Sequence, residues 1–121
     1  MSPTLPVREV SGLLPLTPAT FYVLVAMADD ERHGYAIIKE VSALTGGAVE
    51  LGTGTLYGII KRLLADGLVV ESQRRPRASE DDARRRYYRL TPFGRRVVAA
   101  EAARLEQMVL AARTTGALRK A

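Results

Sequence analysis

Basic side chains are concentrated in one part of this 121-residue sequence. Nine of its 18 lysines and arginines lie between residues 71 and 96, together with four acidic residues. The whole chain carries a formal net charge of +5. Because guanidinium groups bind phosphate oxygens through paired hydrogen bonds, this concentration favours a polyanionic partner, with DNA as the first candidate. The alternative is a soluble protein with a basic surface loop and no such partner.

The stretch Thr53-Gly54-Thr55-Leu56-Tyr57-Gly58 is the second place where residue types indicate chemistry. Thr53 is expected to cap a helix that runs to about Asp66. One face of this helix is apolar, and the opposite face carries Gly54 and Gly58. A glycine within a helix costs about 1 kcal/mol relative to alanine. Two glycines on one face therefore predict a helix whose backbone lies close against a large partner.

Enzyme chemistry finds no support in the sequence. The chain has no cysteine, which excludes thiolate zinc sites and cysteine nucleophiles. No nucleophile has a base beside it, and no carboxylate pair, phosphate-binding loop or metal-ligand cluster occurs. His33, the single histidine, is expected to make a structural hydrogen bond. The sequence therefore predicts a protein that is not an enzyme and that uses no cofactor or metal.

Membrane association is not expected either. The longest uninterrupted apolar run spans residues 21–28, whereas a membrane-spanning helix needs about 20 residues. The N-terminus lacks a charged start followed by an apolar run. We expect no membrane partner and a cytoplasmic location.

Three short helices are expected to position the glycine-bearing face. Thr17-Pro18 has the pattern of a cap followed by proline at the first helical position, and this helix reaches about Ala28. Residues 29–34 form a polar turn, and residues 35–44 form the second helix. A glycine-bearing connection leads from there to the helix that begins at Thr53. This order is typical of a helix-turn-helix.

Two extended runs follow these helices, at residues 68–73 and 86–90. The loop between them, residues 74–85, is polar and rich in arginine. Two strands and a basic loop after such a helix predict a winged helix over residues 17–91. The expected fold class is mainly α, with a small two-stranded β wing.

The two ends of the chain lie outside that unit. Residues 1–16 contain three prolines and form an arm, part of which is expected to dock on the body as a short helical turn. Residues 92–113 form a long helix after a second Thr-Pro cap, and residues 114–121 form a tail. The apolar residues of the arm are Val10, Leu13, Leu14 and Leu16.

The long helix carries an apolar stripe with helical spacing. Because the winged helix can close its own core, we expect this stripe to join two copies of the chain in a homodimer. The alternative is a helix that folds back onto its own domain. The stripe consists of Val98, Ala102, Leu105, Val109 and Ala112.

Several short motifs follow one another along the chain, at residues 33–40, 54–57, 61–63, 66–68, 86–91 and Gly94. In this order and spacing they resemble the PadR family of transcriptional regulators over roughly residues 17–113. The single C-terminal helix is similar to that of the small PadR subfamily. The resemblance implies a winged helix, a dimerising C-terminal helix and a dimer that represses by binding a palindromic operator in double-stranded DNA. It also implies that a small aromatic or drug-like effector can bind near the dimer interface.

The residues expected to contact DNA lie on the second helix, the third helix and the wing. Thr53 and Thr55 can meet phosphate or a base edge, and Gly54 and Gly58 permit close approach. Tyr57 and Lys61, one turn apart, are expected to bind adjacent phosphates; the alternative for Tyr57 is a ring packed on the domain.

The resemblance places Tyr35 and Lys39 near the DNA backbone. In the wing, Arg84, Arg85 and Arg86 are favoured over Arg74, Arg75 and Arg77, because the second strand supports them.

Three functions remain open at this point. The first is a dimeric repressor of the PadR type. The second is a sensor whose ligand lies between the dimerisation helix and the arm and releases DNA. The third is a winged helix that binds proteins and has lost DNA binding, which the arginine density of the wing disfavours.

Overall fold

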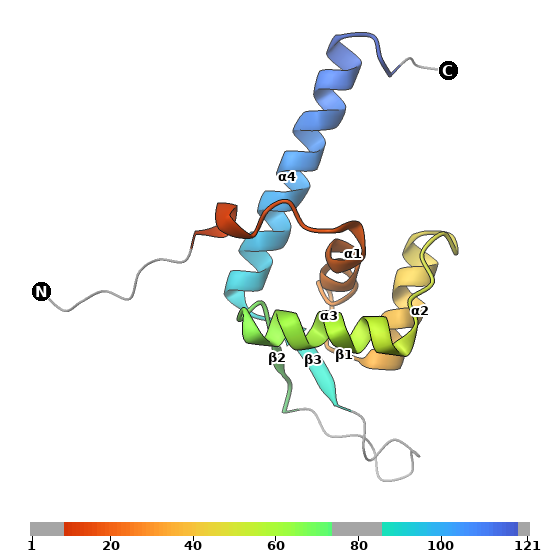
Figure 1. Ribbon diagram of the computed structural model, residues 1–121, viewed down its shortest axis with the longest axis vertical. Coiled ribbons are helices and arrows are strands. Elements are labelled where there is room, and N and C mark those ends of the chain that lie inside the picture. The colour runs from red at the N-terminus through yellow and green to blue at the C-terminus, as the bar shows by residue number, and fades with distance from the viewer. Residues whose placement is uncertain (1–8, 74–85, 119–121) are drawn as a thin grey trace, which may run out of the picture.

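The computed structural model of the chain describes residues 9–73 and 86–118 (Figure 1). Its elements follow the order η1, α1, β1, α2, α3, β2, β3 and α4. The prediction of a mainly helical fold with a small β wing is confirmed. The predicted wing arginines at 74, 75, 77, 84 and 85 lie outside the described residues.

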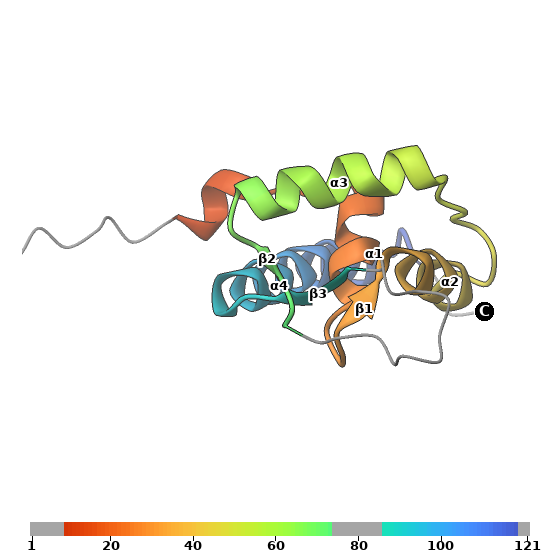
Figure 2. The ribbon, with the colours of Figure 1, turned by 90° about the horizontal axis from the view of Figure 1, so that it is seen from below.

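Helices α1 (Pro18–Ala26), α2 (Gly34–Leu44) and α3 (Thr53–Ala65) pack around one apolar core. The predicted apolar face of α3 is confirmed, because Leu56, Ile60 and Leu63 are all buried. In Figure 2, α3 runs along one edge of the molecule, with the other helices on one side of it. The opposite side of α3 is therefore uncovered.

The helix ends agree with the sequence in most places. The Thr17 hydroxyl accepts a hydrogen bond from Thr20 N, and the Thr91 hydroxyl accepts one from Gly94 N, so both predicted Thr-Pro caps are confirmed. Gly67, at φ 75°, ends α3, and Leu68 N donates a hydrogen bond to the Leu63 carbonyl oxygen in the last turn of the helix.

The start of α3 differs from the prediction. The residue at the cap position is Gly52, which has no side chain to accept a hydrogen bond, and Thr53 is the first helical residue. The expectation that Thr53 caps the helix is therefore wrong. As a consequence, no side chain occupies the free N–H groups at the start of α3, where an anion is attracted.

The sheet has three short antiparallel strands in the order β1-β3-β2: β1 (Arg32–His33), β2 (Val69–Glu71) and β3 (Tyr87–Leu90). The two predicted wing strands are confirmed, and the prediction of a turn throughout residues 29–34 is wrong at its end. Arg32 and His33 pair with Tyr88 and Tyr87. A two-residue strand is too short to show an alternating pattern in the sequence, so β1 can be recognised only from its pairing with β3 in the structure.

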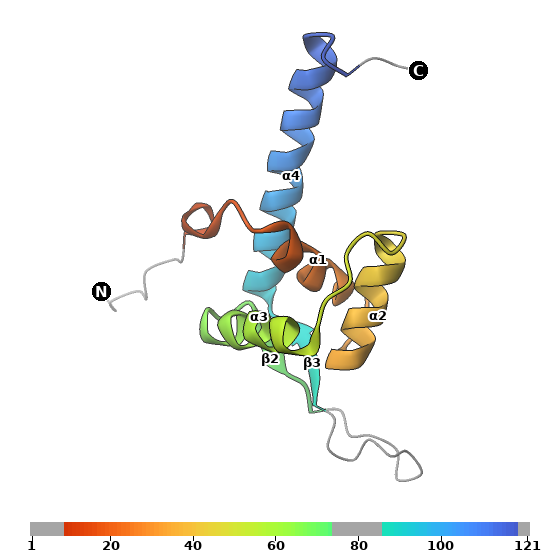
Figure 3. The ribbon, with the colours of Figure 1, turned by 45° about the vertical axis from the view of Figure 1, so that its right-hand side comes forward.

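Helix α4 (Pro92–Thr114) has 23 residues and is therefore about 34 Å long. Figures 1 and 3 show that it rises from the body and leaves its far half without neighbours. Val97 and Glu101, in the near half, are buried, whereas Met108, Val109 and Leu110 are exposed. The near half thus packs on its own domain, and the far half is free to meet another surface.

The arm docks as predicted. The 3-10 helix η1 (Val10–Leu13) packs against α4, and the apolar side chains from Val10 to Leu16 lie partly buried against the core.

Over residues 9–73 and 86–118, no helix is long and apolar enough to span a bilayer.

Candidate nucleic-acid interface

The uncovered side of α3 carries the residues that the sequence singled out. Thr53, Thr55 and Lys61 are exposed. A Cβ built on Gly54 or Gly58 would meet nothing within 4 Å. Neither glycine is required for packing within the chain. The lack of side chains at these two positions therefore leaves the helix backbone accessible on its outer side.

Tyr57 joins α3 to the start of α2. A Cβ on Gly34, the first residue of α2, would overlap the hydroxyl end of the Tyr57 ring. Glycine at 34 is therefore what allows Tyr57 to lie there. The side chain keeps 48% of its surface exposed. The Tyr57 ring thus packs on the domain, as in one of the two interpretations from the sequence. Its exposed side remains accessible to a phosphate, as in the other.

The start of α2 lies beside this tyrosine and carries two more predicted residues. Lys39 Nζ lies 5.5 Å from the centre of the Tyr35 ring, over its face. Tyr35 and Lys39 are both exposed. His33 Nδ1 accepts a hydrogen bond from Ala36 N and caps α2, which confirms the structural role predicted for the histidine.

The base of the wing lies next to Tyr57. Tyr88, in β3, is buried, and this burial is the main cause that raises the pKa of its phenol; the neighbouring Tyr57 raises the pKa further. Arg86, the one predicted wing arginine within the described residues, pairs with Glu71 across the two strands at 3.0 Å. Both partners are largely exposed, so this ion pair contributes little to stability. Arg86 therefore keeps its charge at the surface beside α3.

Two basic residues that the sequence reasoning left out of the interface lie nearby. Arg62 is exposed on the flank of α3, on the same side as Thr55. Arg89 is exposed in β3. The signal for Arg62 was present in the sequence, because helical spacing puts it about two turns beyond Thr55 and so on the same side of the helix. Arg95, by contrast, is used within the fold and donates to the carbonyl of Ala28 at 3.0 Å.

The predicted dimerisation residues fall on a face of α4 adjacent to the one that packs on the body. The body face holds Val97 and Glu101, and the predicted stripe begins one residue later. Val98 packs partly against the core, while Ala102 and Val109 are exposed. The two remaining members, Leu105 and Ala112, are half-buried.

Helix α4 holds a buried charge that its sequence pattern does not predict. Glu101 is 1% exposed and is the one buried charged side chain within residues 9–73 and 86–118. Its carboxylate accepts hydrogen bonds from Arg104 Nε at 2.6 Å and Arg104 Nη2 at 3.0 Å. Leu16 N, in the arm, donates to it at 3.0 Å. The hydrogen bonds from Arg104 and then Leu16 hold the pKa of this carboxyl below its ordinary value, although burial alone would raise it.

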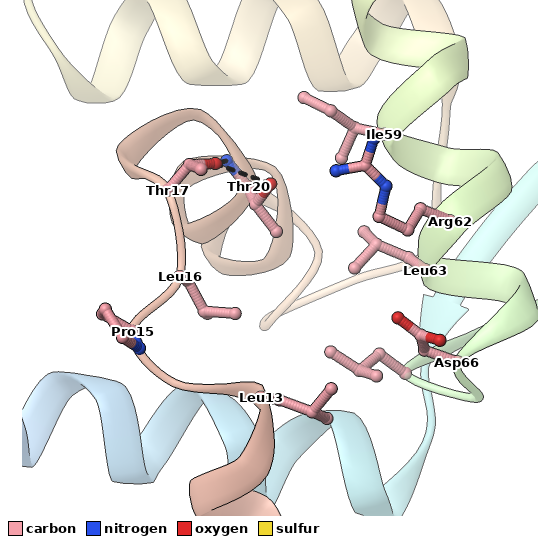
Figure 4. Close-up of a pocket in the computed structure, with 10 residues that line it drawn as sticks. Leu13, Pro15, Leu16, Thr17, Thr20, Ile59, Arg62, Leu63 and Asp66 are labelled. Carbon is pink, nitrogen blue, oxygen red and sulfur yellow. Dashed lines mark hydrogen bonds between the residues drawn. The ribbon is translucent and has the colours of Figure 1, made fainter.

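A pocket of about 170 Å³ opens between the arm and the inner flank of α3 (Figure 4). Its walls are mostly apolar, from Leu13 and Leu16 on one side and Ile59 and Leu63 on the other. Arg62 supplies a cation at its edge. No group of histidine, aspartate and glutamate in the described part of the chain could hold a metal ion.

Two curated relatives match most of this chain. Transcriptional regulator Rv3488 of Mycobacterium tuberculosis is 37% identical over 87 residues, which are 72% of this chain and 75% of that protein. An uncharacterized 37.1 kDa protein in transposon TN4556 of Streptomyces fradiae is 40% identical over 84 residues, 69% of this chain. The match spans 22% of the length of that second relative.

Two solved structures share the fold. BpsR of Bordetella bronchiseptica, solved to explain how 6-hydroxynicotinic acid regulates its DNA binding, has a TM-score of 0.62 and 28% identity, over 91% of this chain and 77% of that one. Bacillus subtilis PadR in complex with operator DNA has a TM-score of 0.58 and 17% identity, over 71% of this chain and 47% of that one.

The sequence profile of the family matches residues 23–100, which run from the middle of α1 to the first half of α4. The matched segment contains the whole helix-turn-helix, all three strands and the base of the wing. The chain belongs to the transcriptional regulator PadR-like family.

Proposed function

We propose that the protein is a homodimeric repressor that binds a palindromic operator in double-stranded DNA. The observation that carries this proposal is the outer face of α3, where two glycines leave the backbone bare and cations flank it. An α-helix fits the major groove, and a helix without bulky side chains on its outer face can lie deeper in it. The related Bacillus subtilis PadR was solved with operator DNA, which supports this mode of binding.

In this proposal each group has a separate task. The free N–H groups at the start of α3, with Thr53 and Thr55, contact phosphate or base edges. Lys61, Tyr57 and the Tyr35–Lys39 pair contact the phosphate backbone on either side. Arg86 and the arginines at 84 and 85 follow the neighbouring groove. The far half of α4 joins two copies, so that two α3 helices meet two half-sites about one helical turn apart.

Lys61→Ala tests the DNA-binding face. A phosphate contact carries no base information, so the variant should bind every sequence more weakly. The slope of log K against log salt should fall by about two, since the dimer loses one phosphate contact in each subunit. Arg113→Ala is the control, because Arg113 is an exposed cation near the far end of α4. Filter binding or gel shift over a salt series measures both. An unchanged slope for Lys61→Ala would contradict the proposed face.

A second candidate function is the release of DNA by a small molecule. The pocket between the arm and α3 supports it, since its volume of about 170 Å³ is close to the roughly 150 Å³ of an apolar cavity that holds benzene. The DNA binding of the structural relative BpsR is regulated by 6-hydroxynicotinic acid, a compound of one ring. The pocket lies against α3 and the arm, not between the arm and α4 as the sequence reasoning expected.

That compound is a direct probe of the second candidate. If it binds in the pocket, adding it should release operator DNA from the wild-type protein, and Arg62→Gln should weaken the release by removing the cation at the edge of the pocket. Because Arg62 also borders the DNA-binding face, the proteins are compared at the same initial fraction of bound DNA. Arg113→Gln, far from the pocket, serves as the matched control. A gel shift with increasing compound measures both. Equal release from the Arg62 and Arg113 variants would exclude this pocket.

A further inference from the structure

The Glu101 contact ties α4 to the entry of the winged helix. Leu16, whose N–H donates to the carboxylate, immediately precedes Thr17, the cap of α1. The hydrogen bond therefore spans 85 positions in sequence and connects the long helix to the first core helix. In Figure 1, the arm crosses α4 before it turns into α1.

The position of this contact along α4 gives it mechanical importance. Closer to the start of the helix, Gly94 lies against the Leu68 backbone, Arg95 donates to Ala28, and Val97 is in the core. Within the described residues, no hydrogen bond farther along α4 than Glu101 reaches another element. The Glu101 contact is thus the outermost hydrogen bond that resists a tilt of α4 against the body.

A tilt of α4 would move the DNA-binding helices of a dimer relative to each other. The part of α4 beyond Glu101 is about 20 Å long, so a tilt of about 10° there displaces its far end by about 3.5 Å. One base-pair step of DNA is about 3.4 Å. A tilt of that size would therefore change the separation of two α3 helices by about one base-pair step for each subunit that tilts.

A carboxylate is suited to hold such an angle. Buried charge is tolerated only with directional hydrogen bonds, and here two oxygens accept three of them, from the arm and from Arg104. An apolar side chain at 101 would pack without fixing a direction, so α4 could slide on the arm. The geometry assigns Glu101 as a positioning residue that sets the spacing of the two half-sites which the dimer accepts. This inference rests on the proposed dimeric DNA binding.

The test compares spacer profiles. Wild-type protein first selects an operator from random double-stranded DNA, and the spacer of that operator is then changed by one and two base pairs. Wild type should lose about tenfold in affinity for a change of one base pair, because the DNA must twist or bend to compensate. Glu101→Gln should lose only about threefold, since a network mutation of this kind changes coupling by a factor of about two to thirty.

The matched control is Glu106→Gln, the same substitution at an exposed position of the same helix. It should reproduce the wild-type spacer profile. Hydrogen exchange of the Leu16 amide, measured without DNA, reports whether the contact is open, and it should accelerate in Glu101→Gln alone. A change in overall affinity with an unaltered spacer profile would indicate a merely structural residue and would overturn the inference.

The remaining outcomes separate the inference from the proposed function. If wild type selects no operator, the proposed function fails and the inference fails with it. If wild type binds one spacing best and Glu101→Gln keeps the same profile with a fast-exchanging Leu16 amide, only the inference fails. Should Glu101→Gln not fold, Glu101→Met replaces it, because an apolar side chain of similar length can pack at this buried position and accepts no hydrogen bond from the Leu16 amide. It should broaden the spacer profile in the same direction.

Discussion

Glycines in this protein serve two opposite purposes. Gly94, in α4, lies so close to the backbone of Leu68 that a Cβ would overlap the Leu68 carbonyl oxygen. Gly58, in α3, has open space where a Cβ would be. The first glycine is required by the fold, whereas the second is costly to the helix and is explained only by an external partner.

Replacing Gly58 or Gly94 with alanine should have opposite effects on the stability of the protein. Gly58→Ala should stabilise the protein by up to about 1 kcal/mol, because alanine favours the helix, and it should weaken operator binding by holding α3 farther from the groove. Gly94→Ala should destabilise it by about 1–3 kcal/mol, since backbone must move. Urea denaturation and gel shift on both variants measure this. A Gly58→Ala protein with wild-type affinity would show that the clearance is unused.

Acid should remove the contribution of Glu101. The pKa of its carboxyl is lowered in the folded protein, chiefly by the hydrogen bonds from Arg104 and then by that from Leu16. The stabilisation is therefore complete above the ordinary pKa of glutamate and is lost as the pH falls through the lowered folded value. Wild type should exceed Glu101→Gln in stability at pH 7, and the difference should shrink towards pH 3. Urea denaturation at the two pH values measures the difference, and a constant gap would contradict the assignment.

At the scale of single residues, the sequence revealed what depends on neighbours along the chain. A structural hydrogen bond was predicted for His33 from its place beside a glycine in a polar turn, and in the structure this hydrogen bond caps α2. Glu101 could not be predicted, because its N–H donor in the arm is 85 positions away and nothing in the alanine-rich helix marks it as buried. The contact of Gly34 with Tyr57 could not be predicted either, because it depends on how α2 and α3 pack against each other.

At the scale of elements, caps with proline were reliable and the cap without it was not. Thr17-Pro18 and Thr91-Pro92 begin helices as predicted, because proline fixes its own φ and so fixes the register. At the start of α3, Gly52 and Thr53 both suit a cap, and the backbone begins the helix at the threonine. Strand β1 escaped prediction, since two residues carry no periodicity and their pairing depends on β3.

The two confirmed caps should differ in importance. The Thr91 hydroxyl accepts from Gly94 N and also donates to the Gly67 carbonyl at 2.7 Å, so it joins α4 to the end of α3. The Thr17 hydroxyl serves α1 alone and is exposed. Thr91→Ala should therefore cost about 2 kcal/mol and Thr17→Ala about 1 kcal/mol or less. Thermal denaturation of the two variants measures the order, and the reverse order would contradict it.

At the scale of the whole molecule, two surfaces lie at opposite ends. Figure 1 places α3 and the sheet at one end and the far half of α4 at the other. Both surfaces were predicted from the sequence, because each depends on periodicity within a single helix. How far α4 stays attached to the body could not be predicted, since it depends on the arm, Gly94 and Glu101 together. The near half of the helix belongs to the domain, and Met108, Val109 and Leu110 in the far half are exposed.

Val109→Asp tests whether that far half joins two copies. Val109 is 45% exposed, so the substitution should change the stability of a single chain by less than about 1 kcal/mol. Inside a dimer, the same carboxylate would be buried without a partner, and the dimer should dissociate. Gln107→Asp is the control, because position 107 lies on the opposite side of the helix and is exposed. Sedimentation should therefore show a monomer for Val109→Asp and a dimer for wild type and Gln107→Asp.

DNA binding by the same variants extends the test to the operator. Two linked DNA-binding units hold a palindrome far more tightly than one unit holds a half-site, because the second contact is made at high effective concentration. Val109→Asp should bind an isolated half-site as well as wild type does, since α3 lies at the other end of the molecule. It should lose about a hundredfold or more in affinity for the full palindrome. A Val109→Asp protein that is monomeric yet binds the palindrome as tightly as wild type would show that repression does not require the α4 dimer.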